Sequence, residues 1–117
     1  EPLVSGNAVL LTAALYNLLT NAVKYGGEDV ELRVSVSGTE ALVAVTDHGK
    51  GMSPDALARV RELFYRGDDA APLDGHGIGL ALVDRIMQVH NGRLELSAVQ
   101  GKGTMALLRM ALLTPGL

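Results

Sequence analysis

The amino-acid sequence predicts an α+β sandwich, in which helices cover one face of a β-sheet. The 117-residue chain opens with a long helical pattern, continues with two alternating strand patterns, and carries a second apolar helical pattern before a closing strand pair. Strands and helices are thus partly segregated along the chain, as in α+β domains. With 48% hydrophobic and 20% charged residues, this length predicts one compact domain over residues 1–117.

Capping residues and turns divide the chain into about five strands and three helices. Asn7 and Ser53 are typical N-caps, and Gly26 and Asn91-Gly92 are typical helix ends. Residues 66–77 lack any periodicity, which predicts a mobile loop. We expect the end of a strand at 3–4, a helix over 7–25, strands over 30–36 and 41–46, helices over 54–63 and 78–90, and strands over 94–98 and 104–112. The alternation over 30–36 predicts a strand that is buried on one face.

Composition excludes several classes of function. The net charge is −3 and no basic stripe is present, so we expect no nucleic-acid partner. The chain has no cysteine, which rules out disulfides and cysteine-based metal sites. No apolar run reaches the ~18 residues of a membrane span, so we expect no membrane contact and a cytoplasmic location.

The first predicted helix carries two neighbouring stripes. An apolar stripe for the core consists of Leu11, Leu15, Leu18, Leu19 and Ala22. Beside it, Asn17, Asn21 and Lys24 follow one another at helical spacing, with Tyr25 close by. Amide oxygens can ligate Mg²⁺ together with waters, and a lysine can meet phosphate oxygens. Taken alone, this second stripe is equally well explained as a solvated helix face.

Three loops rich in glycine follow in order. In Asp47-His48-Gly49-Lys50-Gly51, a carboxylate at a strand end can accept a hydrogen bond from an adenine amine, and glycines allow close approach to a flat ring. Gly75-His76-Gly77-Ile78-Gly79-Leu80 lies at a helix start, whose unpaired N–H groups suit phosphate. Gly101-Lys102-Gly103-Thr104 joins two strands and, alone, reads as an ordinary turn.

The sequence matches neither of two other phosphate-binding motifs. A dinucleotide fingerprint needs glycine at Leu80 and a surrounding βαβ unit, and neither is present. A P-loop needs Lys-Ser or Lys-Thr after its last glycine, and Gly103 is followed by Thr104 alone.

The combination of motifs resembles the catalytic domain of sensor histidine kinases, in the GHKL superfamily of gyrase, MutL and a heat-shock chaperone. It resembles the N, G1, F and G2 boxes and the final glycine motif of that family, in order and over about residues 3–112. The matching segments are Asn17-Leu-Leu-Thr-Asn21-Ala-Val-Lys24-Tyr25, Asp47-x-Gly49-x-Gly51, Leu63-Phe64-Tyr65-Arg66, Gly75-x-Gly77-x-Gly79-Leu80 and Gly101-x-Gly103-Thr104.

The resemblance implies the Bergerat fold, a mixed sheet of about five strands backed by three helices, with ATP between the helices and a flexible lid. It implies catalytic roles for Asn17, Asn21 and Lys24, with Asn21 as the Mg²⁺ ligand assisted by Asn17. It implies that Asp47 binds the adenine amine and that Arg66 engages phosphate. The implied nucleotide contacts are Asn21, Lys24, Tyr25, Asp47, Gly49, Gly51, Arg66, Gly75, Gly77, Ile78, Gly79, Leu80 and Thr104.

One difference from the pattern of the superfamily bears on which reaction the chain catalyses. Hydrolysing members usually carry a glutamate base four residues before the metal-binding asparagine, and this chain has Asn17 there, which cannot act as a base. The resemblance therefore favours transfer of the γ-phosphoryl group to a histidine on a separate dimerisation/phosphoacceptor hairpin. The alternative is a regulatory or scaffolding ATP-binding module without transferase activity. The resemblance further implies a response-regulator receiver domain downstream and a homodimeric parent, for which anchoring in the inner membrane is one option.

The F box departs from the family pattern at one position, and the chain has three histidines. Arg61 stands where the F box often has an additional phenylalanine. His48 and His76 lie in the G1 and G2 loops, where an exposed histidine without a role is the simpler interpretation. His90 has core-like helical spacing, which indicates a structural role. None of the three lies in a phosphoacceptor pattern, so we expect the chain to be a fragment of a larger sensor.

Overall fold

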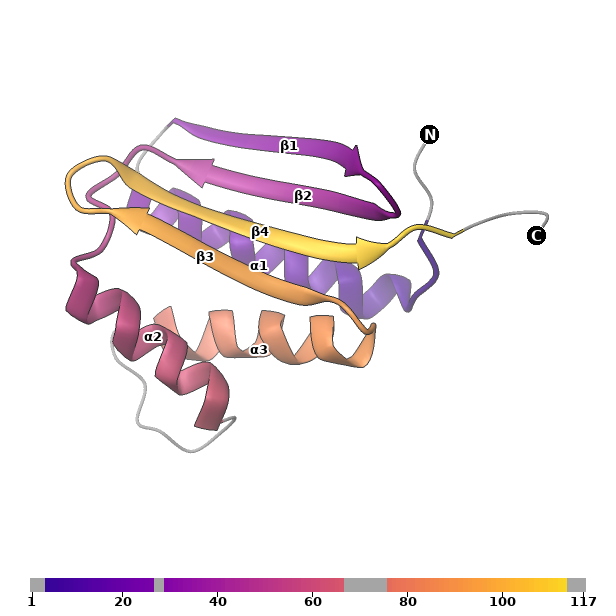
Figure 1. The fold of residues 1–117 in the computed structure, drawn as a ribbon. Helices are drawn as coiled ribbons and strands as arrows, with labels where there is room; N and C mark the ends of the chain where they lie inside the picture. The colour runs from indigo at the N-terminus through magenta and orange to yellow at the C-terminus, as the bar shows by residue number, and fades with distance from the viewer. Residues whose placement is uncertain (1–3, 27–28, 67–75, 114–117) are drawn as a thin grey trace.

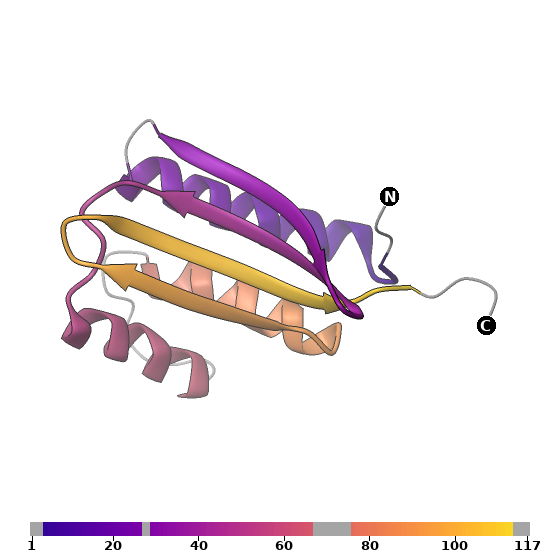
Figure 2. The same cartoon turned by 45° about the horizontal axis from the view of Figure 1, so that its top comes forward.

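The computed structural model describes residues 4–26, 29–66 and 76–113 as a helical layer packed on one face of a β-sheet (Figure 1). In chain order the elements are α1 (Ala8–Gly26), β1 (Val30–Ser37), β2 (Glu40–Asp47), α2 (Pro54–Arg66), α3 (His76–Val89), β3 (Arg93–Val99) and β4 (Gly103–Ala111). Figure 2 shows the twisted sheet on one side and the helices on the other. The α+β class and the three helices predicted from the sequence are confirmed.

The predicted helix caps form as the sequence indicates. The Asn7 side chain accepts a hydrogen bond from the Leu10 N–H at 3.0 Å, which satisfies one of the donors that every helix start leaves unpaired. The Ser53 hydroxyl does the same for Ala56 at 3.2 Å, with Pro54 at the first helical position. These caps fix where α1 and α2 begin.

The sheet has the order β1-β2-β4-β3, and every pair of neighbours is antiparallel. The described residues thus form four strands, rather than the mixed sheet of about five strands that was expected. Val4 lies outside any strand and packs on the core, and Leu3 lies outside the described residues. The parallel pairing of a mixed sheet is therefore not seen in the described part of the chain.

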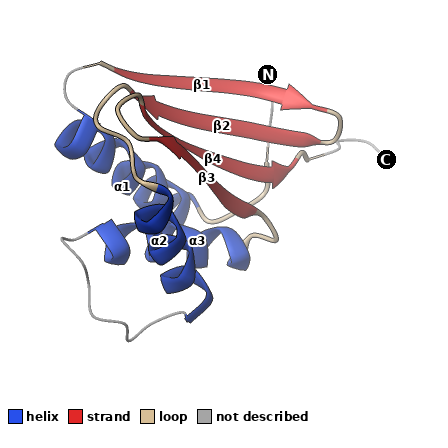
Figure 3. Cartoon of the chain, turned by 60° about the vertical axis from the view of Figure 1, so that its left-hand side comes forward, coloured by secondary structure: helices blue, strands red, loops and turns tan. Residues whose placement is uncertain are grey.

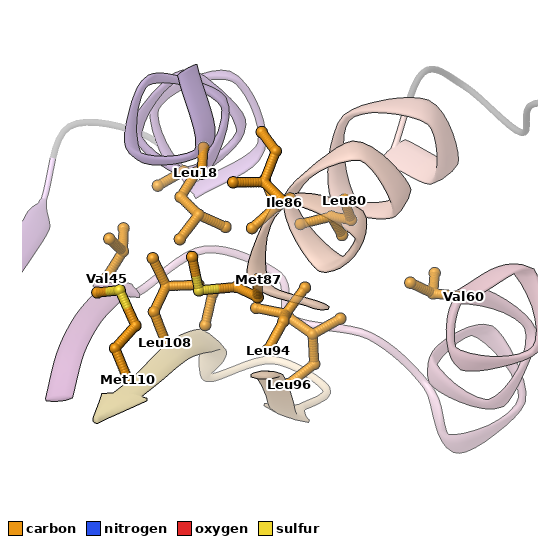
Figure 4. Close-up of a cluster of buried hydrophobic side chains, with 14 residues drawn as sticks. Leu18, Val45, Val60, Leu80, Ile86, Met87, Leu94, Leu96, Leu108 and Met110 are labelled. Atoms are coloured by element: carbon orange, nitrogen blue, oxygen red, sulfur yellow. The ribbon is translucent and has the colours of Figure 1, made fainter. Parts of the chain in front are cut away.

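The core lies between α1, α3 and the central strands (Figure 4). Met87 and Val83 of α3 are completely buried, and Leu18 of α1 packs near them. Further buried side chains come from both layers and include Val45, Val60, Leu80, Ile86, Leu94, Leu96, Leu108 and Met110. Aliphatic residues fill this core, as the scarcity of aromatics requires.

The half-buried strand predicted over residues 30–36 is not half-buried. Leu32, Val34 and Val36 of β1 are 47%, 55% and 51% exposed. Leu32 lies opposite the buried Val45 in the antiparallel register, so the alternation gave the correct face. However, β1 is an edge strand, and α1 and α3 pack mainly over β2, β4 and β3. The helical layer therefore leaves most of this strand uncovered.

None of the helices in the described ranges is both long enough and apolar enough to cross a membrane.

Candidate functional site

Most of the predicted site residues gather at one end of the two layers, whereas α2 leads away from that end toward Arg66 at its C-terminus. The C-terminal end of α1, the end of β2, the turn between β3 and β4, and the starts of α2 and α3 all lie at the left-hand end in Figure 1, and Figure 3 shows the same end from the side. Because α1 and α3 run in opposite directions along the sheet, the C-terminal end of α1 and the start of α3 lie at the same end of the molecule.

Asn17 and Asn21 lie on the edge of α1 next to its buried stripe of Ala14, Leu18 and Ala22. The Asn17 Nδ2 donates to the Ala13 carbonyl at 2.8 Å. Since only the nitrogen of an amide can donate, this bond sets the amide orientation and leaves Oδ1 as the acceptor atom. Asn17 can therefore offer an oxygen to a cation or to one of its waters.

The Asn21 amide is incompletely satisfied. Its Nδ2 is buried and has no hydrogen-bond partner within the described residues. An unpaired buried N–H costs roughly 1–3 kcal/mol, so such a group indicates a missing partner. An amide can turn over to present either atom, and a phosphate oxygen would suit Nδ2 whereas a cation would suit Oδ1. This orphaned atom is thus compatible with a phosphate–Mg²⁺ cluster.

Lys24 lies one turn further along, in the last turn of α1, and its side chain is exposed. Its position on the edge shared with Asn17 and Asn21 agrees with the predicted stripe. Tyr25 belongs to the same last turn, but its side chain lies outside the described part of the structure.

Asp47 ends β2 and is the single buried charged residue within the described ranges, with 9% of its surface exposed. Its Oδ1 accepts the N–H of Gly49 at 2.9 Å and the N–H of Thr104 at 3.3 Å. These two bonds hold the carboxylate between the G1 loop and β4 through one oxygen. The other oxygen, Oδ2, can then accept from an exocyclic amine such as that of adenine.

The glycines of two loops let the backbones interlock beside Asp47. Gly51 has φ 66°, and a Cβ there would overlap the carbonyl oxygen of Val99. Gly103 has φ 124°, and a Cβ there would overlap the carbonyl oxygen of Asp47. A hydrogen bond of 2.6 Å from the Gly101 N–H to the Lys50 carbonyl closes the same contact. The last hairpin is therefore more than a turn, because it braces the loop that carries the carboxylate.

The remaining predicted residues are only partly described. Arg66 ends α2 and Gly77, Ile78 and Gly79 fall in the first turn of α3, without a description of their side chains. Gly75 and the loop predicted to be mobile lie outside the described residues over positions 67–75. α3 begins at His76, two residues before the expected start.

Leu80, which was expected among the nucleotide contacts, packs its side chain into the core. Its side chain is buried in the core with Val83 and Ile86, so any contact with phosphate would have to come from its backbone (Figure 4). Because a leucine side chain offers no polar atom, its place in the G2 segment is explained by packing of α3 on the sheet.

The described residues fit Mg-ATP as a ligand. Asn17 offers an amide oxygen, Asn21 a buried amide nitrogen without a partner in the described residues, and Asp47 a second carboxylate oxygen. Within the described ranges, no group of three His, Asp or Glu side chains could hold a metal by itself. Mg²⁺ commonly takes one or two protein ligands and otherwise binds waters and substrate phosphates, so an amide edge suffices when a nucleotide is present.

Comparison with known proteins identifies the family of the chain. The model of the family described as histidine kinase-, DNA gyrase B- and HSP90-like ATPases matches residues 6–114. The phosphate regulon sensor protein PhoR of Pseudomonas aeruginosa is 40% identical over 105 residues, covering 86% of this chain and 24% of the relative. The chain spans about a quarter or less of the length of the curated relatives it matches.

Two solved structures resemble the fold. The mycobacterial sensor histidine kinase MprB is 29% identical with a TM-score of 0.73, covering 93% of this chain and 74% of that chain. Full-length ShkA in complex with AMPPNP is 28% identical with a TM-score of 0.79, covering 100% of this chain and 24% of that chain. From the family match, the order of the motifs and the geometry of the site, this chain belongs to the histidine kinase-, DNA gyrase B- and HSP90-like ATPase family.

Proposed function

We propose that this chain is the ATP-binding catalytic part of a sensor histidine kinase, which transfers the γ-phosphoryl group of Mg-ATP to a histidine on a separate dimerisation/phosphoacceptor hairpin. The observation that carries the proposal is the edge of α1, where the Asn17 Nδ2 is bonded to the Ala13 carbonyl, leaving Oδ1 as acceptor, and the Asn21 Nδ2 is buried without a partner in the described residues. The kinase names of the relatives and the AMPPNP complex of ShkA support it.

The side chain at position 17 favours transfer over hydrolysis. A glutamate there could deprotonate or orient water, whereas an amide has no useful basicity. A neutral imidazole needs less help from a base, because its attacking nitrogen carries no proton, whereas the attacking oxygen of water must lose one. The residues of the chain then contribute by positioning and charge stabilisation.

The proposal assigns a role to each of the main site residues. Asp47 holds the adenine through Oδ2 while its Oδ1 stays bonded to the backbone N–H groups of Gly49 and Thr104. Asn21, assisted by Asn17, binds the phosphate–metal cluster, and Lys24 at the end of α1 approaches the phosphate oxygens. When bound, Mg²⁺ would neutralise phosphate charge as the phosphoryl group moves. Arg66 and the N–H groups near Gly77 and Gly79 complete the phosphate contacts.

The proposed partners follow from this chemistry. The phosphoryl group passes to the hairpin of a homodimeric parent and from there to a response-regulator receiver domain. Since ATP and such regulators are found in the cytoplasm, we place the domain there.

The test is phosphotransfer with γ-labelled ATP and Mg²⁺, using the chain with and without the dimeric hairpin of its parent protein. The hairpin histidine should acquire an acid-labile, base-stable label. The chain alone should hydrolyse ATP slowly and should not label His48, His76 or His90. Rapid hydrolysis by the isolated chain would point to a hydrolase of the same superfamily. ATP binding without transfer to the hairpin would point to a regulatory module.

A further inference from the structure

His90 lies at the end of α3 and uses both ring nitrogens in hydrogen bonds. Its Nδ1 is 2.8 Å from the Ile86 carbonyl oxygen, one turn back in the same helix. Its Nε2 accepts the backbone N–H of Asn7 at 3.0 Å, 83 residues away in the sequence. Asn7 is the residue that caps α1. The imidazole therefore joins the last turn of α3 to the first turn of α1.

These two partners determine the protonation of the ring. A backbone carbonyl only accepts, so Nδ1 must carry a hydrogen. A backbone N–H only donates, so Nε2 must have its lone pair free. His90 is accordingly a neutral imidazole in the Nδ1–H tautomer, and the hydrogen-bond partners leave no other assignment.

The backbone at the end of α3 and the backbone before α1 both fix the position of the His90 ring. The end of α3 is fixed by a left-handed Asn91 with φ 57° and by a hydrogen bond of 2.8 Å from the Gly92 N–H to the Met87 carbonyl, which is a Schellman ending. On the other side, a Cβ on Gly6 would lie 2.5 Å from Cδ2 of the ring. The backbone before α1 thus approaches the imidazole as closely as a glycine allows.

The contact lies at the opposite end of α1 and α3 from the nucleotide site. The two helices run antiparallel, with Asn21 near the end of α1 and the G2 segment at the start of α3 (Figure 1). We infer that His90 is a positioning residue that ties the start of α1 to the end of α3, and so holds in register the two helices whose other ends bind the nucleotide. The consequence for the nucleotide rests on the proposed function.

Two substitutions of His90 test its two hydrogen bonds one at a time. In His90→Asn, the amide nitrogen can replace Nδ1–H toward Ile86, but nothing reaches Asn7. In His90→Gln, the amide oxygen takes the place of Nε2 and can accept the Asn7 N–H. Val89→Asn is the matched control, because it puts the same residue on an exposed position of the same helix end.

The first readout is nuclear magnetic resonance of the 117-residue chain. In the unmodified chain, imidazole ¹⁵N shifts should show a protonated Nδ1 and an unprotonated Nε2. Amide exchange at Asn7 should be about fivefold faster in His90→Asn, the factor that one ordinary hydrogen bond supplies, and should be nearly unchanged in His90→Gln and in the control. A protonated Nε2, or equal exchange in all variants, would overturn the tie.

The second readout is the affinity for AMPPNP in Mg²⁺. It should fall severalfold in His90→Asn and stay within about twofold of the unmodified chain in His90→Gln and in the control. If Asn7 exchange is faster in His90→Asn but the affinity is unchanged, the hydrogen bond exists without affecting nucleotide binding, and the positioning role is overturned. An unmodified chain that bound no nucleotide would overturn the proposed function and the positioning role together, while the Asn7 exchange would still decide whether the tie exists.

Discussion

Replacing Asp47 by asparagine should weaken ATP binding while largely preserving the fold. The Oδ1 atom carries both structural hydrogen bonds, from the N–H groups of Gly49 and Thr104. An asparagine oxygen can accept both of them, whereas its NH₂ group would replace Oδ2 and face the adenine amine donor to donor. The structural effect and the binding effect of the carboxylate are thereby separated.

The size of the binding effect follows from the charged hydrogen bond that is lost. Removing such a bond costs roughly 1–3 kcal/mol, so the dissociation constant for ATP should rise roughly 5- to 150-fold. The free energy of unfolding should change by less, within about 1 kcal/mol, because the two backbone donors remain paired. Isothermal titration with Mg-ATP and denaturant unfolding measure the two quantities separately.

Asp55→Asn is the matched control, since it removes a carboxylate from the exposed first turn of α2. It should leave ATP affinity unchanged. The unmodified chain should also prefer ATP to GTP, because guanine presents a carbonyl where adenine presents its amine. Equal binding of ATP by Asp47→Asn and the unmodified chain, or equal binding of ATP and GTP, would refute the assignment of Asp47 to the base.

Four further substitutions test other parts of the structure. Gly51→Ala should disturb the G1 loop and weaken ATP binding, because its Cβ would overlap the Val99 carbonyl; a binding constant equal to that of the unmodified chain would show that the two loops are not interlocked. Met87→Ala should lower the free energy of unfolding by about 2–5 kcal/mol, and Val34→Ala by less than about 1 kcal/mol, because Met87 is fully buried and Val34 is 55% exposed; similar losses in urea unfolding would contradict the uncovered position of β1. Burial raises the pKa of the Asp84 carboxyl, so its folded-state pKa lies above the unfolded value of about 3.9 and ionisation opposes folding as pH rises. Asp84→Asn should therefore stabilise the chain at pH 7 but not at pH 3, and a gain of equal size at both pH values would count against this explanation.

Periodicity and capping chemistry predict most of this fold because they act within a few residues. The caps at Asn7 and Ser53 form as expected, and the alternation over β1 identifies the correct face. The same pattern cannot reveal how far a helical layer extends over a sheet, and Val34 is exposed for that reason. The strand end expected at Leu3-Val4 is not seen in the described part of the chain, where Val4 lies outside any strand and Leu3 is not included.

The sequence likewise predicts some features of the candidate site and not others. Asn17 and Asn21 could be placed on one edge of a helix from their spacing alone, and the structure puts both beside the core stripe. The bracing of Asp47 by Gly103 could not be predicted, because it depends on two backbones meeting 56 residues apart in the chain. His90 looked structural from its helical spacing, and its partner at Asn7 appears only when the two helix ends meet.

The most direct test of the nucleotide site is a titration of AMPPNP into the unmodified chain and Asn21→Ala, each in Mg²⁺ and in EDTA. Val23→Ala, on an exposed position of the same helix, serves as the control. If Asn21 binds the metal–phosphate cluster, its replacement should weaken binding in Mg²⁺ and change it little in EDTA, and the control should match the unmodified chain in both. Equal losses in Mg²⁺ and EDTA, or no loss in either, would contradict a metal-dependent nucleotide site on this edge of α1.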